Sequence, residues 1–286
     1  MRINTNINSM RTQEYMRQNQ DKMNTSMNRL SSGKRINSAA DDAAGLAIAT
    51  RMRAKENGLG VASRNTQDGI SLIRTADSAL NSVSNILLRM RDLAVQSANG
   101  TNSVDDKTAL QKEFGQLIEQ IDYIANNTKF NDTDVLKGGT DVHIQTHDTG
   151  GQIDIKLADV RKSSLSGKNA ADADVKLQTL QIGRKDGESK DDNVKEKEAI
   201  TVIDNIIKNV ATSRADLGAT LNRLDFNVAN LNSQASSMAS SASQIEDADM
   251  AKEMSEMTKF KILNEAGISM LSQANQTPQM VSKLLQ

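Results

Sequence analysis

The stretch that decides the fold is "ITVIDNIIKNVATSRADLGATLNRLDFNVANLNSQASSMASSASQI", residues 200–245. Apolar residues recur through it every seven positions, in two series offset by four. One series is Ile203, Val210, Leu217, Leu224, Leu231, Met238 and Ile245; the other is Ile207, Leu221, Val228, Ala235 and Ala242, interrupted by Arg214. This heptad pattern predicts a coiled-coil helix of about 70 Å. We call Ile203, Val210, Leu217, Leu221, Leu224, Val228 and Leu231 the rod seam.

The N-terminal half carries partners of the same period. Apolar residues follow a heptad spacing at Ile73, Ala76, Leu80, Val83, Leu87, Met90 and Ala94. "SANGTNSVDD" (97–106) then interrupts the pattern with an Asn-Gly turn, and Ser103 is the expected N-cap of a shorter helix. Three such helices predict a mainly α fold, a long antiparallel helical rod drawn from both ends of the chain.

The spacing of apolar residues changes in the middle of the chain. "VHIQTHDTGGQIDIKL" (142–157) alternates apolar and polar residues around a Gly-Gly turn, which predicts a small β-hairpin within residues 141–160. Residues 161–197 are rich in charge, Ser and Gly, so we expect a short, variable, exposed insert with one strand at 175–182. The "KEKE" run at 195–198 is expected to be solvated.

The two termini carry sparse, Met-rich apolar stripes. In residues 1–30 these are Ile3, Ile7, Met10, Met16, Met23, Met27 and Leu30; in residues 245–285 they are Ile245, Met250, Met254, Met257, Ile262, Leu263, Met270, Leu271 and Leu285. Packing, more than propensity, holds most helices. Met is an adaptable filler for surfaces that repack against different neighbours. We therefore expect these segments to become ordered only against something else.

Composition excludes several classes of function. Aromatic residues make up 2% of the chain, Cys is absent and the net charge is −1. Disulfides, thiolate catalysis and Cys-based zinc sites are thereby ruled out, and no global charge favours nucleic acid or anionic membranes. No apolar run approaches the roughly 18 residues of a membrane span. "MRINTNINSM" at the start lacks the apolar region of a signal peptide.

Three patterns resemble sites for chemistry. Gly33-Lys34 lacks the upstream glycines and the following Ser/Thr of a phosphate loop. Asp41 and Asp42 are adjacent, so on a helix they would point about 100° apart; we expect them to open a helix capped by Ser38. The two histidines, His143 and His147, are spaced for metal binding on a helix, but they fall in an expected strand and turn. We expect no enzyme, no cofactor and no metal.

Several blocks of the chain closely resemble bacterial flagellin. At the N-terminus they are "MRINTNI", "LSSGKRINSAADDAAGLAIATRMR", "ASRNTQDGISLIRTADSAL", "LLRMRDLAVQSANGT" and "TKFND"; at the C-terminus they are "RADLGATLNRLDF", "IEDADMAKEMSEMTKFKIL" and "MLSQANQTPQMVSKLLQ". The resemblance covers roughly residues 1–160 and 198–286. It implies a subunit that self-assembles helically into the flagellar filament for swimming; the alternative is a hook–filament junction protein.

The resemblance also implies an organisation for the subunit. Inner-layer helices would occupy residues 1–40 (with a connecting segment) and 245–286, and rod helices residues 41–140 and 198–244. The hairpin at 141–160 and the insert at 161–197 lie between them. Type III export would place the protein outside the cell without a cleaved signal. The expected partners are copies of itself, an export chaperone, and the filament cap and junction proteins, with no nucleic acid and no membrane.

Three residue sets follow from the resemblance. The vertebrate flagellin-sensing Toll-like receptor would contact Arg89, Leu93 and Glu113, although packing between subunits would equally account for that surface. The export chaperone would bind a tail anchored by Leu263, Leu271, Leu284 and Leu285. In the joint between Leu30, where the terminal helix would close, and the next helix, the charged residues Lys34, Arg35, Asp41 and Asp42 would pair between copies.

Overall fold

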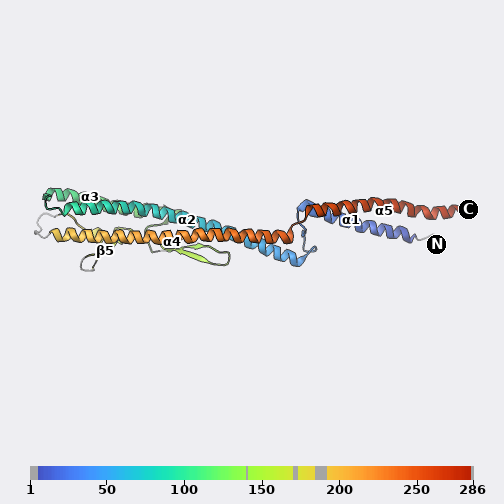
Figure 1. The fold of residues 1–286 in the computed structure, drawn as a ribbon, viewed down its shortest axis with the longest axis horizontal. Coiled ribbons are helices and arrows are strands. Elements are labelled where there is room, and N and C mark those ends of the chain that lie inside the picture. Colours follow the sequence, from blue (N-terminus) through green and yellow to red (C-terminus); the bar gives the residue numbers. More distant parts are fainter. Residues whose placement is uncertain (1–5, 140, 170–172, 184–191, 285–286) are drawn as a thin grey trace. The chain divides into compact units, whose positions relative to one another are not determined.

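The computed structural model describes residues 6–139, 141–169, 173–183 and 192–284, without the side chains of 192–195 and 277–284. The chain forms two compact units. The terminal unit comprises residues 1–57 and 234–286, and the central unit comprises residues 58–233. Five α-helices are described: α1 (Ile7–Ser32), α2 (Ala43–Ser97), α3 (Val104–Asn127), α4 (Asp192–Glu246) and α5 (Met250–Leu284). Helices α2 and α4 contribute residues to both units (Figure 1).

In the central unit, α2 and α4 run antiparallel. Arg91 on α2 bonds Asp204 on α4 at 2.6 Å, and Ser63 on α2 bonds Asn232 on α4 at 3.1 Å. Between these points the rod seam packs on α2 and α3; Ile203, Leu217 and Leu224 are at most 2% exposed. Burying each such side chain fully stabilises the fold by about 1.5–3 kcal/mol. The apolar residues of the heptad pattern thus form the core of this unit.

Helix α3 begins where the sequence predicts. Ser103 is its N-cap: the Ser103 hydroxyl accepts the Asp106 amide at 3.2 Å, and the Asp106 carboxylate accepts the Ser103 amide at 3.0 Å. This reciprocal capping satisfies two helix-end donors. Phe114 and Ile121 of α3 are completely buried in the core of the central unit.

The central unit also contains small pairs of antiparallel strands. The predicted hairpin is β3 (Val142–Gln145) paired antiparallel with β4 (Gln152–Ile155). Two shorter antiparallel pairs join β1 (Lys129–Phe130) to β2 (Thr133–Asp134) and β5 (Ser166–Lys168) to β6 (Asp174–Lys176). Gly69 of α2 allows the hairpin to lie close, because a Cβ there would sit 3.0 Å from Ile144 Cγ1.

The exposed insert was predicted wrongly. Its described part contributes buried side chains to the core: Leu165, Leu177, Leu180 and Ile182. The strand expected at 175–182 ends with β6 at Lys176, and a 3-10 turn, Leu177–Thr179, follows it. Helix α4 already begins at Asp192, and Glu196 of the "KEKE" run is 2% exposed. Sparse leucines among charged residues therefore pack inward here.

Candidate functional site

Helices α1 and α5 pair with each other in the terminal unit. They run antiparallel: the Asn6 amide bonds Ala274 O at 2.8 Å, Asn264 bonds Gln20 at 2.6 Å, and Arg29 bonds Glu253 at 3.3 Å. Most of their less exposed residues follow two heptad series. On α1 these are Ser9, Thr12, Met16, Asn19, Met23, Ser26 and Leu30; on α5 they are Glu253, Met257, Phe260, Asn264, Gly267, Leu271 and Ala274. We call these fourteen residues the terminal seam.

The terminal seam is mostly small or polar, unlike the rod seam. At one point Gly267 lets the helices approach closely, because a Cβ there would lie 2.8 Å from Met16 Cγ. Two side-chain atoms near one end of the seam, Arg29 Nε and Glu253 Oε2, are buried and lack a hydrogen-bond partner among the described residues. Eight of its fourteen residues are small or polar, so the terminal seam has fewer large apolar contacts than the all-apolar rod seam and stabilises its helix pair less.

The large apolar side chains of α1 and α5 lie mostly outside the terminal seam and are exposed. Their exposed fractions run from 41% at Leu263 to 65% at Met270. The set is Ile7, Met10, Met27, Met250, Met254, Ile262, Leu263, Ile268 and Met270. We call it the terminal apolar surface. Contiguous exposed apolar surface is characteristic of a protein interaction site, and these nine side chains place exposed apolar atoms along both helices.

The segment that joins α1 to α2 is hydrogen-bonded to the C-terminal end of α4. Gly33 ends α1 in a left-handed conformation, φ 71°, so the helix closes at Ser32 and not at Leu30. The Arg35 amide then bonds Glu246 O at 2.7 Å, and the Ala248 amide bonds Gly33 O at 2.9 Å. The two connecting segments of the terminal unit are therefore held together by main-chain hydrogen bonds.

The charged residues of the joint all have partners within the chain. Lys34 and Arg53 pair with the carboxylate of Glu246, whose side chain is 9% exposed. The Arg35 guanidinium donates to Ile245 O at 2.7 Å. Sequence reasoning missed Glu246; its only signal is an acid at the end of a long heptad helix.

The two joint acids act as caps. Asp42, and not Ser38 as expected, is the N-cap of α2, since its carboxylate accepts the Gly45 amide at 2.9 Å. Asp41 accepts the amides of Ser38 at 2.9 Å and Asn37 at 3.1 Å. These hydrogen bonds, that from the Ser38 amide first, hold the pKa of the Asp41 carboxyl below its ordinary value. Both acids therefore already serve the fold of the single chain.

The residues matched to the receptor epitope separate into two groups. Arg89 of α2 and Glu113 of α3 form an exposed ion pair, with Arg89 Nη2 2.7 Å from Glu113 Oε1. Leu93, expected on the same surface, is instead completely buried in the core. Leu93 lies one helical turn after Arg89 on α2. Leu93 faces the core of the central unit, whereas Arg89 lies at its surface.

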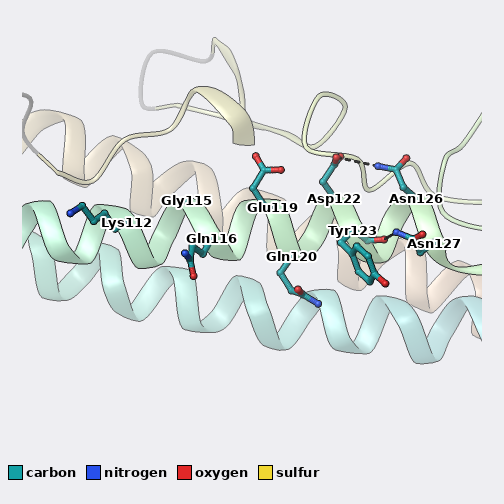
Figure 2. Close-up of a pocket in the computed structure, with 9 residues that line it drawn as sticks. All are labelled: Lys112, Gly115, Gln116, Glu119, Gln120, Asp122, Tyr123, Asn126 and Asn127. Atoms are coloured by element: carbon teal, nitrogen blue, oxygen red, sulfur yellow. Dashed lines mark hydrogen bonds between the residues drawn. The ribbon is translucent and has the colours of Figure 1, made fainter.

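A shallow hollow along α3 is the candidate pocket (Figure 2). It is lined by Lys112, Gly115, Gln116, Glu119, Gln120, Asp122, Tyr123, Asn126 and Asn127. Figure 2 shows Gln116, Gln120 and Tyr123 directed toward α2, with Glu119 and Asp122 on another side. Lys162 bonds Glu119 at 2.8 Å. These lining residues include no pair of nucleophile and base.

Each histidine is paired with a different aspartate. His143 Nδ1 is 2.6 Å from Asp154 Oδ1 across the β3–β4 pair, and His147 Nδ1 is 2.6 Å from Asp148 Oδ1. The Asp154 hydrogen bond and charge raise the pKa of His143 above its ordinary value. Within the described ranges, no group of three or more His, Asp or Glu is arranged to hold a metal. Nor does any helix in those ranges have the length and apolarity to cross a bilayer.

The expected chaperone-binding tail lies on α5. Leu263 is 41% exposed and Leu271 is half-buried in the terminal seam. Leu284 is the last residue of α5, but its side chain and the whole of Leu285 lie outside the described residues.

Comparison with known proteins matches both ends of the chain to one family. Residues 3–141 match the bacterial flagellin N-terminal helical region, and residues 200–285 match the bacterial flagellin C-terminal helical region. A flagellin of Listeria innocua is 47% identical over 291 residues, covering 100% of this chain and 99% of that protein. The flagellar filament 33 kDa core protein of Treponema phagedenis is 39% identical over 289 residues, covering 100% of both.

A structural neighbour has a related fold but a distant sequence. A putative flagellar hook-associated protein of Vibrio parahaemolyticus aligns with a TM-score of 0.62 over 72% of this chain and 100% of that chain. The two are 15% identical, so the likeness extends to the fold alone. The junction-protein alternative is therefore less supported than a filament subunit.

Proposed function

Because the chain belongs to the bacterial flagellin family and is a structural subunit of the flagellar filament, we propose that α1 and α5 form the filament's inner layer. Residues 1–40 and 245–286 would make this layer, and the helices of residues 41–140 and 198–244 would make the layer around it. The hairpin and the segment 161–197 would lie toward the outside.

The terminal apolar surface is the observation that carries this proposal. Nine apolar side chains of α1 and α5 are about half exposed or more in the single chain. Full burial of one such side chain is worth about 1.5–3 kcal/mol. Copies that covered this surface would supply the stabilisation that the small, polar terminal seam lacks. The terminal helices would thus become ordered in the same step in which they bind neighbouring copies.

We extend the proposal to export and to partners. Weakly held terminal helices suit a chain that threads a narrow type III channel unfolded, so we place the assembled subunit outside the cell. The tail containing Leu263, Leu271, Leu284 and Leu285 would bind an export chaperone, and the cap and junction proteins would meet the same terminal helices at the filament ends. We assign the protein no catalytic activity, nucleic-acid partner or membrane partner.

We propose that receptor recognition rests on the exposed Arg89–Glu113 pair. Leu93 would act beneath it, by fixing the face of α2 that carries Arg89. Replacing Arg89 and Glu113 together with Ala should abolish Toll-like receptor signalling by the monomer. An unchanged response at matched concentration would remove this assignment. Because the pair is exposed, the same double variant should keep the thermal stability of the central unit.

Seeded growth tests the assembly proposal. Filaments are heated to monomers, short seeds are added, and elongation is followed by electron microscopy. Replacing Ile262 and Leu263 with Asp should stop elongation while the central unit stays helical by circular dichroism. Lys261→Asp, at the adjacent exposed position of α5, is the matched control and should still elongate. Normal elongation of the double Asp variant would show that the termini do not carry assembly.

A further inference from the structure

Methionine is the most frequent residue on the terminal apolar surface. Five of the chain's 13 methionines lie there, with exposed fractions of 49–65%. They are Met10, Met27, Met250, Met254 and Met270. In the central unit, by contrast, Met90 of α2 is completely buried. The thioethers that solvent reaches most easily are therefore on the helices proposed to assemble.

An exposed thioether is open to a defined oxidation. A sulfur lone pair attacks one oxygen of hydrogen peroxide, an S–O bond forms, the O–O bond breaks, and water leaves after proton transfer. The sulfur is oxidised to the sulfoxide and the peroxide is reduced to water. The product is polar, and methionine sulfoxide reductases convert it back to methionine.

We infer that Met10, Met27, Met250, Met254 and Met270 form a reversible oxidation site that controls whether a free subunit can elongate a filament. The inference rests on the function proposed above, in which copies cover this surface. A sulfoxide oxygen buried between copies without a hydrogen-bond partner opposes the apolar contact.

Assembly itself would change the reactivity of the site. In the free subunit the five thioethers face solvent, so peroxide reaches them. In the filament the neighbouring copies would cover them, so the same dose would oxidise them more slowly. The oxidant therefore acts on subunits that have not yet been incorporated, and a grown filament is protected. Leucine at these positions would give a similar apolar surface without this response.

Peroxide treatment of monomers tests the inference. Monomers are treated until mass spectrometry of peptides shows one added oxygen at each of the five methionines and none at Met90. Elongation from untreated seeds should then fall about tenfold, since burial of one unpaired polar oxygen opposes binding by roughly 5- to 150-fold. Incubation with both methionine sulfoxide reductases should restore it. Undiminished elongation by the oxidised monomer, or no recovery after complete reduction, would overturn the inference.

A variant distinguishes oxidation of the five methionines from oxidation elsewhere in the chain. The five-fold Met→Leu variant should elongate equally well before and after peroxide, whereas Met90→Leu should stay as sensitive as the natural chain. Equal loss in the five-fold variant would place the damage elsewhere and overturn the inference. Should the five-fold variant fail to elongate untreated, the reductase recovery of the natural chain decides. Failure of the proposed function appears separately, as elongation by the Ile262/Leu263 Asp variant without any oxidant.

Discussion

Replacement of Arg214 by Leu tests the heptad pattern of α4 at the polar residue that interrupts its second series. Arg214 occupies the heptad series of Ile207, Leu221 and Val228 on α4. Its Nε lies 2.7 Å from Asp77 Oδ1 on α2, and its Nη1 lies 3.2 Å from Asn81 Oδ1. Hydrogen bonding to Asp77 raises the pKa of Arg214, which keeps it charged.

Exposure decides the size of the effect. The side chains of Arg214 and Asp77 are 34% and 45% exposed, so solvent screens their ion pair, which is worth about 0–1 kcal/mol. A Leu buried to about two thirds would gain roughly 1–2 kcal/mol from the 1.5–3 kcal/mol of full burial. Asp77 keeps access to water, so its loss of a partner costs little. Arg214→Leu should therefore stabilise the central unit by about 1 kcal/mol.

Thermal unfolding of the monomer measures this change. For a unit of this size, about 1 kcal/mol corresponds to a melting temperature higher by about 2–4 °C. Arg214→Ala is the matched control: it removes the ion pair and gains little burial, so its melting temperature should not rise. A lower melting temperature for Arg214→Leu than for the natural chain would refute the reasoning, because the ion pair would then outweigh the apolar burial.

Three further changes have defined outcomes. Gly218→Ala in α4 should raise the free energy of unfolding by about 0.8–1 kcal/mol in denaturant titrations, since nothing lies within 4 Å of the added Cβ; a loss would reveal a hidden clash. Ser103→Ala should cost about 1 kcal/mol in the same titration because Asp106 loses its capping partner, and no loss would contradict the capping role. NMR titration should show the pKa of His143 above its ordinary value, falling in Asp154→Asn. Because this pKa is raised by folding, the pair's stabilisation is present below the ordinary pKa and is lost as pH rises through the raised one; an unchanged pKa in Asp154→Asn would refute the pairing.

The central unit could be largely predicted because its sequence pattern and its packing agree. Apolar residues at heptad spacing, such as Leu217 and Leu224, are the residues that the structure buries. Even the polar residues in the second heptad series, Arg214 and Asp249, which follows Ala242 by seven positions, have a physical reason. Arg214 pairs with Asp77, and Asp249 accepts the Ala251 amide at 3.0 Å where α5 begins. Polar residues in an apolar series here indicate specific pairing or the end of a helix.

The terminal seam could not be predicted from hydrophobicity. The apolar stripes mixed residues of the seam, such as Met16 and Met23, with residues of the exposed surface, such as Met10 and Met27. The seam itself contains Ser9 and Ser26, which are buried, and an apolar search passes over them. Their heptad spacing was present in the sequence, but small polar residues carry that signal only once a partner helix is known.

The expected exposure of the described part of the insert and of Leu93 was wrong for a related reason. Leu177 and Ile182 lie in a short run within a segment rich in charge, Ser and Gly, whose composition predicts exposure, yet both are buried. Leu93 was carried over with Arg89 as a surface residue; it lies beside the heptad positions Met90 and Ala94 but outside both series. Local composition does not say which face of a segment meets the core.

The small, polar seam between α1 and α5 has a kinetic consequence for filaments. Fixing a residue's backbone costs about 1–2 kcal/mol, and this seam recovers little of that cost. Two free subunits that meet must both order their terminal helices before either is covered. At an existing end, the receiving copies are ordered already, so only the newcomer bears that cost. The proposed assembly through α1 and α5 therefore predicts that nucleation is much slower than elongation, with subunits in solution staying dispersed until a growing end is present.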